Sequence, residues 1–156
     1  MDRIDDAILT CLKNDGRMSN KELAAAVGLA PSSCLERVRR LQEKGVLQGY
    51  RALVDVRSLG IGLQAFVSVR LSQHARTAVD DFRTHIITLP EVIAVYHVAG
   101  QEDFLVHVAV RDADHLRNLT LDGFTTRAEV ARLNTALIYE YIRHPTLPNY
   151  AIDEEI

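Results

Sequence analysis

The chain has 156 residues, which is enough for one large domain or two small ones. Its composition, with 47% hydrophobic and 25% charged residues, is that of a soluble globular protein and excludes an intrinsically disordered chain. No apolar run approaches the roughly 20 residues of a membrane-spanning helix, and the N-terminus is acidic rather than signal-like. We therefore expect a cytoplasmic protein that does not insert into a membrane.

The net charge of −3 argues against nucleic-acid binding only until its distribution is considered. Residues 1–57 carry ten Lys and Arg against eight Asp and Glu, a balance of +2. Residues 58–156 carry eight against thirteen, a balance of −5, and the two balances together give −3. The N-terminal part is therefore the part suited to contacting phosphates.

The first predicted element is a helix from Arg3 to Asn14. Its apolar residues recur at the helical spacing i, i+4, i+7 and i+8, and they are Ile4, Ile8, Cys11 and Leu12. Cys11 and the second cysteine, Cys34, both fall on apolar helix faces. We expect two buried thiols rather than a disulfide or a metal pair.

The next stretch predicts two short helices joined by a tight turn. Ser19 and Glu22 have the spacing of a capping box, and Gly28 suits the left-handed conformation that ends a helix. Pro31 suits the first turn of the second helix, and Gly45 stops that helix. Together with the first helix, they predict a three-helix winged helix-turn-helix domain.

The second of these helices has an apolar side and a polar, basic side that suits the major groove. The core-facing residues are Cys34, Val38 and Leu41. The candidate DNA-binding residues are Ser32, Ser33, Glu36, Arg37, Arg39 and Arg40. Arg39 and Arg40 are expected to point outward, and Arg37 to flank the core, where it suits a phosphate. Glu36 either accepts from cytosine N4 or only pairs with Arg40. The alternative for the whole stretch is a helical hairpin whose basic face meets only water.

Residues 46–55 are extended by composition and predict a hinge strand or a wing directly after the second helix. Residues 56–62 contain two glycines and predict a linker. We therefore place the helix-turn-helix domain with its hinge strand in residues 1–55, and a second domain after residue 62.

Beyond the linker, the order β-α-β-β-α-β predicts a ferredoxin-like domain over residues 63–143, followed by a tail over residues 144–156. The expected strands are Leu63–Leu71, Val92–Val98, Phe104–Val110 and Val130–Tyr141, and the expected helices are Thr77–Leu89 and one capped by Asp114 and ended by Gly123. Gly100–Asp103 is the hairpin turn between the two middle strands. The fold class is α+β.

Helices cover only one face of such a sheet. Along the Phe104–Val110 strand, Val106 and Val108 alternate with Leu105 and Ala109, which leaves little polar surface on either face. An apolar second face needs a cover, and a second copy of the chain is the simplest one. We expect a homodimer built on these sheets, and we expect a charge at Val108 to disrupt it.

Short motifs recur in a fixed order along the chain. They are Ile4-Asp5 to Leu9, Asp15-Gly16-Arg17, Glu22-Leu23-Ala24, Gly28-Leu29, Arg37–Leu41, Gly45-Val46, Gly49-Tyr50 and the Gly-x-x-Asp-aromatic turn Gly100–Phe104. With these motifs, the sequence resembles the Lrp/AsnC family of transcriptional regulators over nearly its whole length. The resemblance implies a reader of double-stranded DNA, a hinge strand, and a regulatory domain that dimerises and often assembles into octamers.

The resemblance also implies a small effector, typically an amino acid, bound near the Gly-x-x-Asp turn at an interface between dimers. The implied effector-binding residues are Gly100, Gln101, Asp103, Phe104 and Thr135. The family often has Thr-x-Thr in its final strand, and Leu133 replaces the first Thr here, which favours an aliphatic or aromatic amino acid. The alternative for Asp103 is that its carboxylate only caps its own turn.

Catalysis has no support in the sequence. No nucleophile elbow, phosphate loop or zinc-protease signature is present. The histidines show no metal-ligand spacing, and they are His74, His85, His97, His107, His115 and His144. We expect no enzyme, no cofactor and no metal. The main hypothesis is a DNA-binding, effector-responsive transcriptional regulator, and the alternative is an oligomeric interaction module without an effector.

Overall fold

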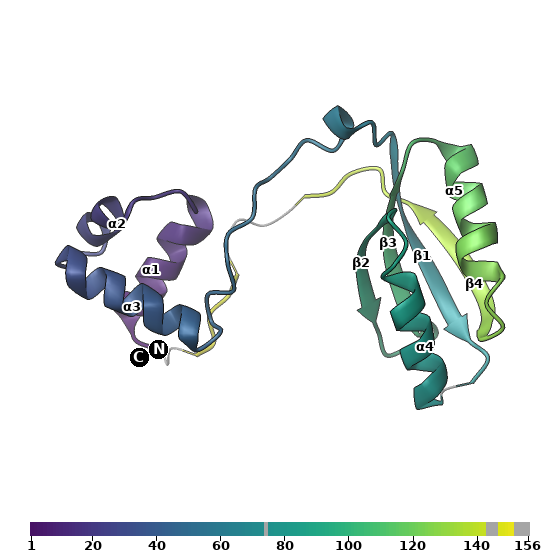
Figure 1. The fold of residues 1–156 in the computed structure, drawn as a ribbon, viewed down its shortest axis with the longest axis horizontal. Helices are drawn as coiled ribbons and strands as arrows, with labels where there is room; N and C mark the ends of the chain where they lie inside the picture. Colours follow the sequence, from purple (N-terminus) through teal and green to yellow (C-terminus); the bar gives the residue numbers. More distant parts are fainter. Residues whose placement is uncertain (74, 143–146, 152–156) are drawn as a thin grey trace. The chain divides into compact units, whose positions relative to one another are not determined.

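The computed structural model describes residues 1–73, 75–142 and 147–151, and the chain divides into two compact units (Figure 1). The first contains Met1–Leu53 together with the described residues from Ile142 onward, and the second contains Val54–Tyr141. Each unit has a hydrophobic core of its own. The expectations for His74, His144 and part of the C-terminal tail fall outside the described residues.

Three helices form the first unit: α1 (Arg3–Asn14), α2 (Asn20–Ala26) and α3 (Pro31–Glu43). Their apolar stripes meet in one core, as the helical spacing predicted. The buried residues are Ile8, Leu9, Leu12, Leu23, Ala24, Cys34 and Leu41. Cys34 is buried, Cys11 is half-buried, and both are free thiols. Burial raises the pKa of the Cys34 thiol, so it stays protonated and packs as a small apolar side chain.

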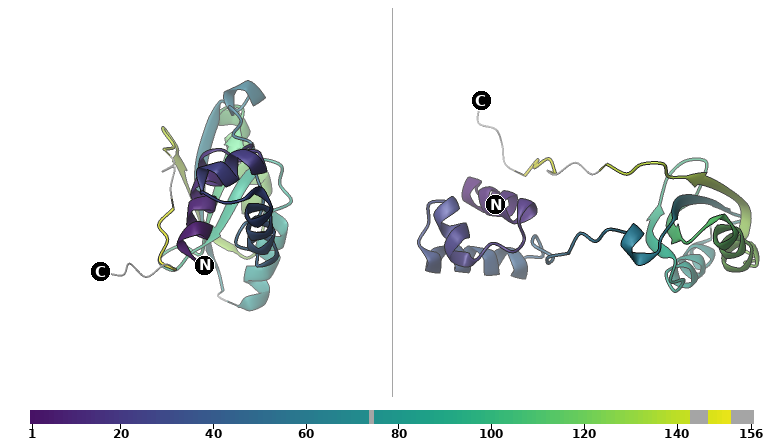
Figure 2. Two further views of the ribbon diagram at one scale, coloured as in Figure 1. Left: turned by 90° about the vertical axis from the view of Figure 1, so that its left-hand side faces the viewer. Right: turned by 90° about the horizontal axis from the view of Figure 1, so that it is seen from above.

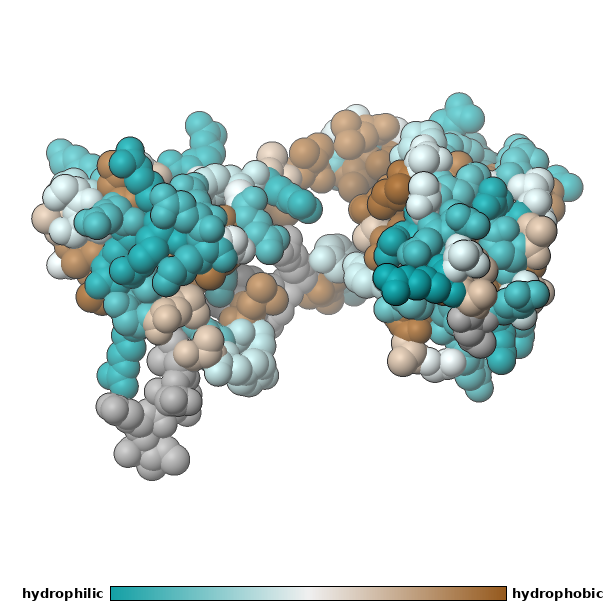
Figure 3. Space-filling view, turned by 60° about the horizontal axis from the view of Figure 1, so that its bottom comes forward, coloured by the Kyte–Doolittle hydropathy of each residue, from teal (hydrophilic) through white to brown (hydrophobic). Residues whose placement is uncertain are grey.

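The stretch between α3 and the second unit contains no helix or strand until the short 3₁₀ turn Arg57–Leu59. The expected hinge strand over residues 46–55 therefore does not form within one chain, because no described segment supplies a neighbouring strand to pair with it. Apolar side chains along this stretch are exposed, and Leu53 is 90% exposed. Figure 3 shows the hydrophobic surface that results.

The second unit is built on one antiparallel sheet with the strand order β2-β3-β1-β4. Its strands are β1 (Leu63–Leu71), β2 (Val92–His97), β3 (Phe104–Val110) and β4 (Val130–Leu137). The helices α4 (Arg76–Ile86) and α5 (Ala113–Leu119) lie on the same face of the sheet (Figures 1 and 2). The element order β1-α4-β2-β3-α5-β4 confirms the predicted ferredoxin-like arrangement.

The helix-covered face of the sheet forms the core of this unit. Val67 of β1 lies opposite Val106 of β3, and both are fully buried. The rings of Phe82 in α4 and Phe104 in β3 pack with centroids 4.8 Å apart. Val108 is also on this face and is 0% exposed. The expectation that Val108 faces a second copy of the chain is therefore wrong, because its side chain lies in the chain's own core.

Both ends of the second unit's last helix, α5, differ from the prediction. Asp112 caps α5 instead of Asp114, since its side chain accepts a hydrogen bond from the His115 N–H at 2.8 Å. The helix also runs on into one π-helical turn, Thr120–Thr125, instead of ending at Gly123. Gly123 is buried where an added Cβ would lie 2.9 Å from Leu89 Cδ1. This glycine does not end the helix, and its packing leaves little room for a Cβ beside the end of the Leu89 side chain.

Candidate DNA-binding and effector sites

The turn between α2 and α3 is fixed by local hydrogen bonds. Ser19 and Glu22 form the predicted capping box: Glu22 Oε2 accepts from the Ser19 N–H at 2.8 Å, and Ser19 Oγ accepts from the Glu22 N–H at 3.3 Å. Gly28 takes the left-handed conformation with φ 69°, and Pro31 is the first residue of α3. The Asn20 side-chain amide donates to the Pro31 carbonyl at 2.8 Å. This last bond ties the start of α2 to the start of α3 and sets the angle between them.

One side of α3 is packed and the other is free. Cys34 and Leu41 are buried in the core, and Val38 is packed against it, as predicted. The opposite side carries four exposed residues that form no hydrogen bond or ion pair with any described residue. They are Ser32, Ser33, Glu36 and Arg39. These side chains can therefore contact a ligand without breaking an internal bond.

Arg37 and Arg40 are instead engaged within the unit. Arg37 Nη1 donates to Asp2 Oδ2 at 2.6 Å and to Asp5 Oδ1 at 2.8 Å. Arg40 Nη2 lies 3.2 Å from each oxygen of Asp5. The alternative pairing of Arg40 with Glu36 does not form between these two described residues, because the Arg40 side chain turns toward α1.

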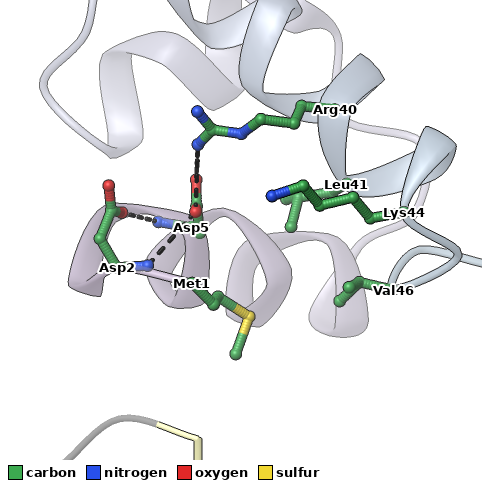
Figure 4. Close-up of a pocket in the computed structure, with 7 residues that line it drawn as sticks. All are labelled: Met1, Asp2, Asp5, Arg40, Leu41, Lys44 and Val46. Atoms are coloured by element: carbon green, nitrogen blue, oxygen red, sulfur yellow. Dashed lines mark hydrogen bonds and ion pairs between the residues drawn. The ribbon is translucent and has the colours of Figure 1, made fainter.

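The ion pairs of Asp5 lie beside an open pocket of about 350 Å³ between the start of α1 and the end of α3 (Figure 4). Its lining residues are Met1, Asp2, Asp5, Arg40, Leu41, Lys44 and Val46. The close-up shows Arg40 reaching toward Asp5, with Lys44 one turn further along α3. Because both carboxylates of the lining are already hydrogen-bonded, the pocket offers no free acid for a metal or an amine. Within residues 1–73, 75–142 and 147–151, no cluster of three His, Cys, Asp or Glu side chains is arranged to hold a metal ion.

The turn between β2 and β3 is tied to the end of β1. The Asp103 N–H donates to the Val69 carbonyl at 2.9 Å, and the Val98 N–H donates to the Asp103 carbonyl at 2.9 Å. The Asp103 carboxylate is buried, and its Oδ2 accepts from the Leu71 N–H at 2.7 Å. Gly100 begins the turn with φ 146°, a conformation that favours glycine. The Asp103 side chain thus ties the turn to the end of β1, rather than capping its own turn as the alternative expected.

The remaining effector candidates lie in different surroundings. Phe104 is fully buried between Phe82 and His97, whose ring stacks on it at 4.7 Å. A ligand at the turn would therefore meet the backbone of Phe104 rather than its ring. Gln101 is exposed at the tip of the turn. Thr135 is exposed on β4 opposite Val67, so β1 separates it from the turn.

Two residues with well-defined environments were not singled out from the sequence. Asp5 is 3% exposed and lies on the same helical stripe as the buried Ile8 and Leu12. An acid on an apolar stripe is the signal that would have predicted a buried ion pair. Glu102 is the second: its Oε2 atom is buried and has no hydrogen-bond partner among the described residues. No sequence pattern distinguishes it from an exposed turn residue.

Comparison with known families places both units. Residues 1–42 match the AsnC-type helix-turn-helix domain, and residues 64–147 match the Lrp/AsnC ligand binding domain. The chain belongs to the Lrp/AsnC family. This Lrp/AsnC protein is 45% identical to the HTH-type transcriptional regulator AldR of Mycolicibacterium smegmatis over 143 residues, which are 92% of this chain and 84% of that protein. It is 37% identical to the leucine-responsive regulatory protein of Escherichia coli K12, over 92% of this chain and 87% of that one.

Solved structures agree with this assignment. A transcriptional regulator of Neisseria meningitidis in complex with L-methionine has a TM-score of 0.87 and 32% identity, covering 95% of this chain and 96% of that one. The AldR structure of Mycobacterium tuberculosis has a TM-score of 0.76 and 38% identity, covering 92% and 95%. The protein is therefore a helix-turn-helix transcriptional regulator and not an enzyme. Among its described residues, no helix has the length and apolar character to cross a membrane.

Proposed function

We propose that this Lrp/AsnC regulator reads DNA with the polar side of α3 and responds to an amino acid bound near the Gly100–Phe104 turn. The DNA-binding surface comprises Ser32, Ser33, Glu36 and Arg39, and the other two candidates, Arg37 and Arg40, flank it and are held in ion pairs by α1. The observation that carries the proposal is the unpartnered polar side of α3, opposite a side packed into the helix-turn-helix core. The protein acts in the cytoplasm, where its DNA is.

The face of the sheet opposite the helices supports a homodimer. Phe66, Leu105 and Ala109 are half-buried there without any helix over them, and Tyr96 is 50% exposed. The His107 ring on this face bonds to the Gln64 side chain through Nε2 at 2.8 Å. The Nε2 atom of His107 therefore already has a partner when a second sheet covers the face. We infer a dimer through this face and a higher-order assembly of dimers such as an octamer.

Selection of bound duplexes from a random DNA library tests the DNA reading. A dimer with two recognition helices requires a two-fold symmetric site whose half-sites lie about 10 base pairs, or a multiple of that, apart. Recovered sequences that share such a symmetric motif would support the proposal. Recovered sequences without any shared or symmetric motif would refute sequence-specific reading by a dimer.

The effector turn has groups that match an amino-acid zwitterion. The backbone N–H groups of Gln101 and Glu102 donate to no acceptor in the described part of the chain, so they suit a carboxylate. The buried Oε2 of Glu102 suits the ammonium group. Asp103 then acts by holding the turn. The methionine complex of the Neisseria relative supports an effector of this class. An aliphatic or aromatic effector remains the expectation from Leu133 in place of a Thr, although the Leu133 side chain packs against the core of its own unit.

Calorimetric titration of the twenty amino acids tests the effector proposal. We expect an apolar amino acid to bind wild type, Glu102→Gln to weaken that binding at least tenfold, and the exposed control Glu140→Gln to leave it unchanged. Asp103→Ala should lower the melting temperature, because the Leu71 N–H loses its acceptor. Equal binding by wild type and Glu102→Gln would refute the role of Glu102. If no amino acid binds wild type at millimolar concentration, the effector proposal fails while the DNA proposal stands.

A further inference from the structure

We propose that Asp5 determines which arginines of α3 contact DNA. Its ion pairs keep Arg37 and Arg40 from binding the phosphates, so that only Arg39 of the three contacts them. The proposal rests on the DNA-binding surface proposed above and assigns different roles to the three arginines of α3. Asp5 is a positioning residue, because it acts through the arginines and does not touch DNA itself.

The carboxylate of Asp5 joins the first turn of α1 to the middle of α3. Asp5 Oδ2 accepts from the Asp2 N–H at 3.3 Å, and the Asp2 side chain accepts from the Asp5 N–H at 2.8 Å, which completes a capping box. The same carboxylate accepts from Arg37 and from Arg40. Its two oxygens thus serve three donors: one backbone N–H and two guanidinium groups.

The electrostatics of Asp5 keep this arrangement intact. Burial raises the pKa of Asp5, but the hydrogen bonds from Arg37 and from the Asp2 N–H, with the charge of Arg40, outweigh it and hold the pKa below 3.8. The carboxylate is therefore ionised wherever DNA is bound. Removing both arginines would leave a buried charge without a partner, which costs several kcal/mol. An exposed, salt-screened phosphate contact gives much less in return.

The three arginines differ in how they are held. Arg37 is bonded to two carboxylates, and its side chain is 24% exposed. Arg40 is bonded to one, and its side chain is 46% exposed. Arg39 is exposed and has no partner among the described residues. Arg39 and Arg40 are neighbours of equal charge on one helix, so they form a matched pair for a test.

Phosphate contacts can be measured without knowledge of the operator. The measurement is the salt dependence of binding to a fluorescein-labelled duplex of random sequence, about 40 base pairs long. Each contact contributes about 0.9 to the slope of log K against log salt, or about eightfold in affinity at 0.1 M salt. We expect Arg39→Gln to lose that slope and affinity, and Arg40→Gln to leave both unchanged. Equal losses in the two variants would overturn the proposal.

Asp5→Asn supplies the converse test. It removes the charge that holds Arg40, so the slope should steepen by about 0.9 and non-specific affinity should rise, even though the melting temperature falls. Glu22→Gln is the control: it removes one exposed acid from the same unit, but Glu22 bonds to Ser19 and to no arginine.

If Asp5 has only a structural role, Asp5→Asn should bind DNA more weakly than wild type. If the salt slope steepens as much in Glu22→Gln as in Asp5→Asn, the effect is a general one of net charge. Either result overturns the proposal. If Asp5→Asn does not fold, the comparison of Arg39→Gln with Arg40→Gln still decides. A wild type that binds no duplex even at low salt would refute the DNA-binding proposal itself, and this one with it.

Discussion

Val108 and Ala109 are adjacent in β3 and point to opposite faces of the sheet, so the same substitution at each separates folding from assembly. Val108 is 0% exposed beneath the helices, and Ala109 is half-buried on the open face. We predict that Val108→Asp unfolds the second unit. We predict that Ala109→Asp leaves the unit folded and dissociates the assembly.

The magnitudes follow from burial. Removing a fully buried valine costs about 1.5–3 kcal/mol, and an unpaired carboxylate in the same place adds several more. The total, roughly 5 kcal/mol or more, is comparable with the whole stability of a typical domain, about 5–15 kcal/mol. Asp at position 109 stays partly in contact with water in the single chain and costs about 1 kcal/mol, because Asp is disfavoured in strands. In a dimer covered by a second sheet, the same charge becomes buried.

Thermal unfolding by circular dichroism and mass by sedimentation equilibrium are the two measurements. Val108→Asp should lose the cooperative thermal transition of its second unit. Ala109→Asp should still unfold in a cooperative thermal transition, but it should sediment with a lower mass than wild type. Wild-type melting of Val108→Asp would show that the face assignment is wrong. Wild-type mass for Ala109→Asp would show that the open face is not the dimer interface, without excluding a dimer built elsewhere.

Three further predictions concern stability. Gly62→Ala should destabilise the second unit by about 2–3 kcal/mol in chemical denaturation, because the new Cβ clashes with the rigid Arg111 carbonyl. Gly123→Ala should cost only about 1 kcal/mol, because its new Cβ meets the movable Leu89 side chain. The pKa of Asp5 lies below 3.8 in the folded protein, so its stabilisation is present above that pH and is lost as the pH falls further; Asp5→Asn should lack this loss in an acid titration followed by circular dichroism. Burial lowers the pKa of His107 below 6.5, so the unfolded chain takes up the proton at a higher pH than the folded chain does. The melting temperature of the second unit should therefore decrease as the pH is lowered from 6.5, and His107→Gln should reduce this dependence.

The fold was predictable from the sequence because its signals are local and periodic. The apolar spacing in α1 and α3, the capping box at Ser19 and the alternation in β1 each reflect one element whose buried side is decided by its own residues. The choice between the two faces of β3 is different. Both faces of that strand are apolar, so only the position of the helices decides which side is the core, and the sequence alone assigned Val108 to the wrong one.

The candidate sites were less predictable for a related reason. Outward direction on α3 suggested that Arg40 is free, but its partner Asp5 is 35 residues away in the sequence, and no spacing rule connects them. Asp103 likewise bonds to Leu71, which is 32 residues away. Interactions between separate elements depend on tertiary packing, and composition and periodicity do not encode which long side chain reaches which partner.

The stretch that connects the two units explains why an effector would need the assembly to act. The stretch from Lys44 to Gly62 has no strand and only one short 3₁₀ turn, so it gives no stiff path for a signal along one chain. A ligand changes DNA binding only by preferring one arrangement of the protein over another, and moving a balance from 1:99 to 99:1 needs about a 10⁴-fold preference. One small amino acid rarely supplies that much, but four linked sites with about tenfold preference each do.

We therefore predict that effector-dependent DNA binding in wild type is cooperative, with a Hill coefficient clearly above one. Ala109→Asp should abolish this cooperativity even at effector concentrations that saturate the turn. Non-cooperative regulation in wild type, or regulation retained by the dissociated variant, would show that the signal passes within a single chain.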